Sequence, residues 1–127
     1  MGLDNGIIIT KGVKRKNIPS FVHFDNYIKP TIELCYWRKC WGIRNMILQK
    51  LHGRDSDHTD LDVEDIPVII KILKYFCSEK RWEEEADSIW EYKDFKDILI
   101  DQIINLSWFY DYWQHHPNVK CYFYDSY

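Results

Sequence analysis

The two ends of the chain, MGLDNGIIITKG (residues 1–12) and VKCYFYDSY (residues 119–127), decide the fold. In the first, an unbroken β-branched run from Ile7 to Thr10 predicts a short strand that is buried on both faces. In the second, two sets of residues alternate from Val119 to Asp125, and this period of two also predicts a strand. Because the first strand is too short to be stable alone, we expect the two ends to pair in one small antiparallel sheet.

Between the two ends, three segments show the apolar spacing of amphipathic helices. The first helix is expected from Ile32 to Leu51, the second follows a cap at Asp62, and the third follows a cap at Asp94 and continues to Trp113. The segment of residues 54–60, RDSDHTD, is polar and is predicted as a loop. The sequence therefore predicts an α+β fold, with three main helices packed on one face of a sheet that pairs the N- and C-terminal strands.

The length and composition indicate one domain over residues 1–127. The chain has 127 residues, of which 46% are hydrophobic, so it can bury a sizeable core. Its 17 basic and 20 acidic side chains give a net charge of −3, which argues against a nucleic-acid partner. One local basic cluster, KGVKRK at Lys11–Lys16, is interpreted as a solvated turn, with phosphate contact as the alternative.

Several classes of protein and of site are not favoured by the sequence. It contains no apolar run long enough to span a membrane and no signal peptide, so we expect no membrane partner and a cytoplasmic location, with the four cysteines reduced. The cysteines lack zinc-binding spacing, and the acidic segment 54–60 lacks the Gly and Glu of an EF-hand loop. We therefore expect no metal site and no cofactor.

The stretch ELCYWRKCW, Glu33 to Trp41, gathers aromatic and charged residues within one segment. On a helix, Arg44 would lie against the indole of Trp37 or of Trp41. In one interpretation the aromatic residues join this helix to the sheet, while Arg38 is anchored by a carboxylate such as Asp4. In another, the same residues line a pocket. The candidate ligand-binding residues are Asp4, Glu33, Tyr36, Trp37, Arg38 and Lys39.

The segments MGLD at the start, YWRK at Tyr36–Lys39 and CYFYDSY at the end resemble a family of small uncharacterised proteins of tailed phages and prophages. The resemblance implies phage or prophage ancestry and expression in a bacterial cytoplasm, and it implies no established activity. The chain departs from the family pattern at Cys40 and Trp41, and Arg44 replaces a histidine. A mechanism based on that histidine cannot be transferred.

The function expected from these features is non-enzymatic binding of a host or phage macromolecule. Trp, Tyr and Arg, which dominate interface hot spots, are abundant, and there is no GxSxG, HExxH or glycine-rich phosphate loop. One alternative is binding of a nucleotide-like or other small anionic ligand by the YWRK segment. Another is a small enzyme that uses Asp4 or Glu33 as acid or base, although no residue is assigned as catalytic. All three require the N-terminal strand to lie beside the YWRK segment.

Overall fold

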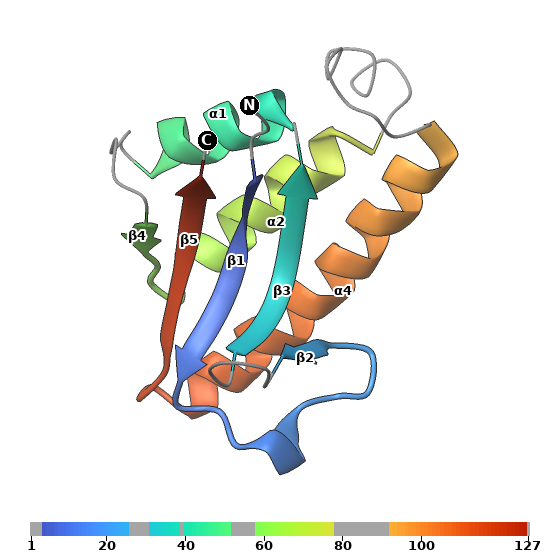
Figure 1. The fold of residues 1–127 in the computed structure, drawn as a ribbon. Coiled ribbons are helices and arrows are strands. Elements are labelled where there is room, and N and C mark those ends of the chain that lie inside the picture. Colours follow the sequence, from blue (N-terminus) through green and yellow to red (C-terminus); the bar gives the residue numbers. More distant parts are fainter. Residues whose placement is uncertain (1–3, 26–30, 39, 52–57, 78–91, 127) are drawn as a thin grey trace.

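In the computed structural model, a five-stranded antiparallel sheet lies in front of a layer of helices (Figure 1). The structure describes residues 4–25, 31–38, 40–51, 58–77 and 92–126. The predicted α+β fold is confirmed. The strands are β1 (Asp4–Lys11), β2 (His23–Asp25), β3 (Thr31–Arg38), β4 (His58–Asp60) and β5 (Lys120–Ser126). The helices are the 3-10 turn η1 (Arg15–Asn17) and the α-helices α1 (Trp41–Lys50), α2 (Asp65–Tyr75) and α4 (Tyr92–His115).

The strand order is β2-β3-β1-β5-β4, so β1 is the central strand. Its Ile7 lies between Cys35 of β3 and Phe123 of β5, and all three side chains are buried. The predicted pairing of the N- and C-terminal strands is therefore confirmed. The start of β1 and the end of β5 lie at the same end of the sheet, next to α1 (Figure 1).

The helix expected from Ile32 to Leu51 is wrong over its first part. Residues Thr31–Arg38, including the YWR of the YWRK segment, form strand β3, and helix α1 begins only at Trp41. A register shift places Cys35 opposite Ile7 and Glu33 opposite Ile8, which leaves Leu34 as an extra residue. Leu34 and Cys35 are both buried, so the period of two is interrupted and the apolar spacing resembles that of a helix.

The two edge strands were not recognised in the sequence. Residues 58–60, expected in a loop, form β4 and pair with β5. Residues 23–25 form β2 and pair with the first residues of β3. Both strands have only three residues, too few to show a periodic pattern. The rest of the predicted loop, residues 54–57, lies outside the described part of the chain.

The second and third predicted helices are confirmed as α2 and α4, but their predicted caps are wrong. The residue before α2 is Glu64 rather than Asp62, and Asp94 lies inside α4, which begins at Tyr92. Helix α2 buries Ile66, Ile69 and Leu73, and α4 buries Leu99 and Phe109 among others. Because these apolar positions recur every three or four residues, each helix covers the sheet with one continuous stripe. Of the helices in the described part of the chain, none is long and apolar enough to cross a membrane.

Helix α4 also bonds to the backbone of β3. The side-chain amide of Asn105 donates to the carbonyl oxygen of Leu34 at 3.0 Å, and that of Gln102 donates to the carbonyl oxygen of Tyr36 at 3.1 Å. Strand β2 pairs with β3 only at residues 31–33, so these two carbonyls lie beyond its reach. The amides of α4 supply the missing donors.

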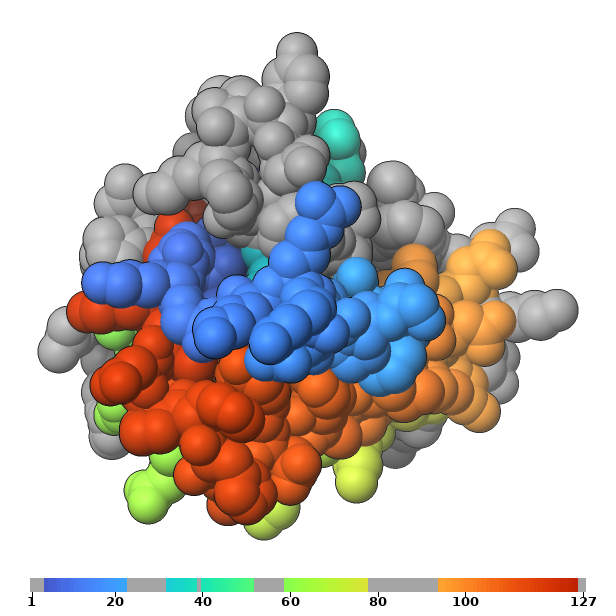
Figure 2. Space-filling model, turned by 90° about the horizontal axis from the view of Figure 1, so that it is seen from below, coloured from blue at the N-terminus to red at the C-terminus, as the bar shows by residue number. Residues whose placement is uncertain are grey.

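The segment between β1 and β2 crosses the end of α4. Viewed from below, residues 11–22 lie against the last turns of α4 and the start of β5 (Figure 2). Asn17 contacts the hydroxyl of Tyr112 at 3.5 Å. The segment leaves β1 through Gly12, whose φ of 96° is one that side-chain-bearing residues rarely adopt. The four basic residues of Lys11–Lys16 are exposed, as expected for a solvated turn.

Candidate functional site

Strand alternation divides the candidate residues between the two faces of the sheet. Asp4 lies opposite Arg38 and Gly6 opposite Tyr36, and these positions face away from the helices. Trp37 faces the helices, and Lys39 lies outside the described residues. The tyrosines of β5 at alternate positions share the outer face with β1 and β3. We call this set the open-face patch: Asp4, Glu33, Tyr36, Arg38, Tyr122 and Tyr124.

Tyr36 is fixed to its neighbour strand by a short hydrogen bond. Its hydroxyl donates to Oδ1 of Asp4 at 2.7 Å, and the ring is 39% exposed. The hydrogen bond to the Asp4 carboxylate raises the pKa of Tyr36, since it stabilises the protonated phenol. The Tyr36 ring is therefore held in one orientation at the surface.

Tyr124 lies across Gly6 at the centre of the patch. A Cβ atom on Gly6 would be 2.9 Å from Cε1 of the Tyr124 ring and would collide with the carbonyl oxygen of Cys35. Only glycine leaves room for the ring at this position. Burial, followed by the negative charge of Glu33, raises the pKa of Tyr124, with smaller effects from Tyr36 and Asp4. These groups therefore act on one another as one cluster.

Trp37 belongs to the core. Its side chain is 2% exposed, and its Nε1 donates to Oε1 of Gln102 at 2.7 Å. Gln102 in turn donates to the backbone of Tyr36, so the indole and α4 are connected through one amide. A side chain this deeply buried offers no surface to a ligand. Its role in the structure is to join β3 to α4.

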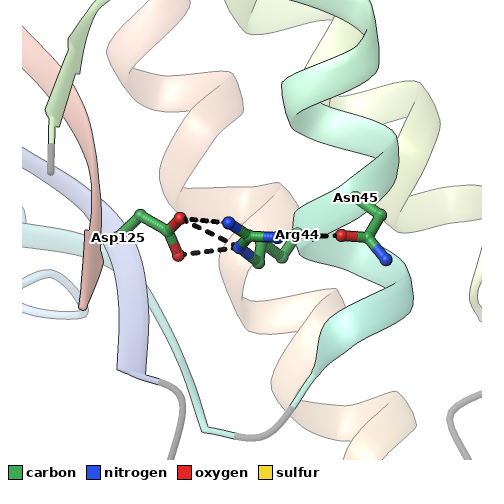
Figure 3. A network of polar contacts seen from close by, with 3 residues as sticks. All are labelled: Arg44, Asn45 and Asp125. Atoms are coloured by element: carbon green, nitrogen blue, oxygen red, sulfur yellow. Dashed lines mark hydrogen bonds and ion pairs between the residues drawn. The ribbon is translucent and has the colours of Figure 1, made fainter. Parts of the chain in front are cut away.

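The charges paired at a buried junction are Arg44 and Asp125, whereas the sequence had suggested Arg38 and Asp4 (Figure 3). Nε of Arg44 lies 3.0 and 2.9 Å from the two carboxylate oxygens of Asp125, and Nη2 lies 2.8 Å from Oδ2. The guanidinium carbon lies 5.4 Å from the centroid of Trp41, which confirms the expected stacking on one of the two indoles. This ion pair joins the first turn of α1 to the end of β5.

Beside this ion pair the sheet buries another polar side chain. Asn5 lies opposite both Trp37 and Asp125 and is fully buried, yet its amide nitrogen and oxygen have no hydrogen-bond partner. Unsatisfied buried amides reduce stability. Among the described residues, the helix face at this end of the sheet is thus polar and largely buried.

One cleft lies away from the candidate residues. It measures about 890 Å³ and runs between the β4–α2 connection and the end of α4. None of the candidate residues lines it. Its rim includes Asp60, Asp62, Glu64, Trp113, Pro117 and Lys120. Within the described residues, no three His, Cys, Asp or Glu side chains are placed to hold a metal ion.

No protein-family model, no curated protein and no solved structure matches this chain. The resemblance to small phage and prophage proteins therefore stays an expectation from three short segments. The evidence on function therefore comes from the chemistry of the residues in the open-face patch.

Proposed function

We propose that the protein is a non-enzymatic binding module that docks a host or phage protein on the open-face patch. The observation that carries this proposal is a sheet face on which Tyr36, Tyr122 and Tyr124 gather, turned away from all the described helices. Tyrosine provides a large, amphipathic contact at a low cost in conformational entropy. Phage or prophage ancestry and a bacterial cytoplasm belong to the same proposal and rest on the sequence resemblance.

The order within the patch supports binding. Asp4 holds the ring of Tyr36, and the ring of Tyr124 lies in the space that the missing side chain of Gly6 leaves. Side chains that already occupy one orientation lose less entropy when a partner docks. The patch is therefore better suited to recognition than the same residues would be on a flexible loop.

The charges of the patch favour a cationic partner surface. Asp4 and Glu33 place two carboxylates around the tyrosines, and Arg38 contributes one cation at the margin. Lysine or arginine from a partner could form ion pairs with the carboxylates and stack on the rings. The same carboxylates repel phosphates, so the small-anion alternative rests on the exposed Arg38 alone among the described residues.

Site-specific photocrosslinking tests the proposal directly. A photoreactive phenylalanine analogue replaces Tyr36 in one variant and the exposed Ser20, outside the patch, in a matched control. In bacterial lysate, position 36 should give a discrete crosslinked protein that position 20 does not give. Prior mutation of Tyr122 and Tyr124 to Ala should remove that product. Equal labelling at both positions, or no discrete product at position 36, contradicts the proposal.

Two further measurements separate the alternatives. A rise in melting temperature with nucleotides or other anionic metabolites, lost in Arg38→Ala, would favour the small-ligand function. Turnover of any compound, abolished by Asp4→Asn or Glu33→Gln, would favour an enzyme. The binding-module proposal predicts neither effect.

A further inference from the structure

The outer surface of the helical layer, on the side away from the sheet, carries apolar residues where polar ones are expected. Ile100 and Ile104 of α4 are 40% and 48% exposed. At about 100° per residue, two side chains that are nine residues apart are separated by two and a half turns, so they point to opposite sides of the helix. Ile100 is therefore directly opposite the buried Phe109, and Ile104 is directly opposite the buried Phe95. Both isoleucines point straight outward.

Helix α2 shows the same feature next to α4. Its Tyr75 is 39% exposed and lies nine residues from the fully buried Ile66, so it also points away from the core. Helices α2 and α4 lie side by side behind the sheet (Figure 1). Three large apolar side chains thus share one outer surface, which we call the helix-layer face.

On this face, the exposed positive charges lie on α2 and the exposed negative charges lie on α4. The exposed charged residues of α2 within its last two turns are Lys71 and Lys74, whereas α4 exposes Asp97 and Asp101. None of these four forms an ion pair within the described part of the chain. Burial raises the pKa of Cys77 at the end of α2, and the positive charge of Lys96 in α4 partly opposes this rise, so Lys96 lies on the α2 side. One half of the face is basic and the other half is acidic.

We propose that the helix-layer face is a two-fold interface through which the protein associates with a second copy of itself. A two-fold rotation places α2 of one copy on α4 of the other, and every contact occurs twice. Lys71 and Lys74 then meet Asp97 and Asp101 of the partner copy, while the isoleucines and tyrosines are covered. Stacking α4 on α4 would instead bring like charges together.

This inference goes beyond the proposed function, because it concerns the opposite side of the molecule. In such a dimer the open-face patches remain uncovered and point outward. Two patches on one particle would bind a repetitive or oligomeric partner with higher avidity than a single patch. The arrangement therefore gives a reason for apolar residues on a surface that the fold alone does not require.

Paired charge reversals test the interface. Variant A carries Lys71→Glu and Lys74→Glu, and variant B carries Asp97→Lys and Asp101→Lys. The mass of the full-length protein is measured by sedimentation equilibrium over a concentration series. The wild type should dimerise. Each variant alone should have a dimer affinity at least about tenfold lower, because each reversed contact occurs twice. Mixed in equal amounts, A and B should form a heterodimer with restored affinity.

Several outcomes would overturn the inference. A wild type that stays monomeric at all concentrations does so, as does a dimer that both variants retain. Failure of A and B to associate when mixed would also count against it, provided that circular dichroism shows both to be folded. The control variant is Lys14→Glu with Lys16→Glu, two exposed residues outside the face, which should leave dimerisation unchanged.

Discussion

The two faces of the sheet use the same residue types in opposite ways at the end where β1 begins and β5 ends. On the helix face, Asp125 is 6% exposed and bound to Arg44, and the buried Trp37 lies on the other side of the central strand. On the open face, Asp4 accepts a hydrogen bond from the exposed Tyr36, and Arg38 points to solvent. Each face has a carboxylate, a guanidinium and an aromatic ring. Burial, rather than residue type, separates the structural group from the candidate binding group.

Adjacent residues of a strand lie on different faces of the sheet, so the residues of one sequence motif do not share a single role. Trp37 and Arg38 are neighbours in the sequence, yet one is in the core and the other is exposed. In a strand, successive side chains point to opposite sides. A motif such as YWRK therefore divides into alternating structural and accessible positions. Substitutions on each face should separate these roles by the size of their effects on stability.

The largest difference is expected between Trp37 and Tyr36. Trp37→Ala should reduce the free energy of unfolding by about 4 to 8 kcal/mol, because it leaves a cavity and removes the hydrogen-bond donor to Gln102. A loss of this size is enough to unfold many small domains. Tyr36→Ala should cost about 1 kcal/mol or less, since its ring is at the surface. Urea denaturation followed by tryptophan fluorescence measures the first change, and circular dichroism measures both.

The two carboxylates provide the next comparison. Asp125→Ala should destabilise the fold by about 3 to 5 kcal/mol, because Arg44 would remain largely buried without its counter-charge. Asp4→Ala removes one exposed hydrogen bond and should cost about 1 kcal/mol or less. Chemical denaturation of both variants at neutral pH gives the two values. Equal losses of unfolding free energy in the two variants would show that burial does not determine how much each carboxylate contributes to stability.

A smaller effect is expected at alkaline pH. Burial and the nearby Glu33 raise the pKa of Tyr124, whose ordinary value is 10.0, so the folded protein keeps this proton when the unfolded chain has lost it. Stability from this group is complete below pH 10 and falls as the pH rises further, by at most about 1.4 kcal/mol per pH unit. In Tyr124→Phe this component should disappear. Unfolding free energies of both proteins, measured from neutral to alkaline pH, test it.

The smallest effect is expected at Arg38. Because its side chain is exposed, Arg38→Ala should change the free energy of unfolding by no more than about 0.5 kcal/mol. Its effect should be on partner binding, through the charge of the open-face patch. The thermal midpoint and the crosslinking yield at position 36 are the two measurements. A large loss of stability would place Arg38 with the structural residues instead.

The sequence predicted the elements with sustained patterns and missed those whose pattern is interrupted. Helix α4 repeats its apolar spacing from Phe95 to Trp113, and β5 alternates throughout. The helix prediction extended into β3 because Tyr36 and Cys40 continue the apolar spacing of α1. The extra residue Leu34 also interrupts the strand's period of two. A local bulge depends on the partner strand, so no local pattern reveals it.

The site was predicted in part for the same reason. Asp4 and the YWRK segment were expected to meet, and the register places Asp4 opposite Arg38. The Arg44–Asp125 ion pair joins residues 81 positions apart, and no local spacing indicates such a contact. One signal was present: Asp125 shares its strand face with Cys121 and Phe123. A carboxylate on an otherwise apolar face requires a cation.

The amides of Gln102 and Asn105 also affect what the sheet can do next to other proteins. Where β2 ends, β3 would otherwise present unsatisfied carbonyl groups, and such an edge can recruit a strand from another chain into amyloid-like assemblies. By occupying those carbonyls, two side chains of one helix end the growth of the sheet on that side. The partner that we propose would then dock on a face of the molecule, where side chains decide recognition, rather than on this edge of the sheet.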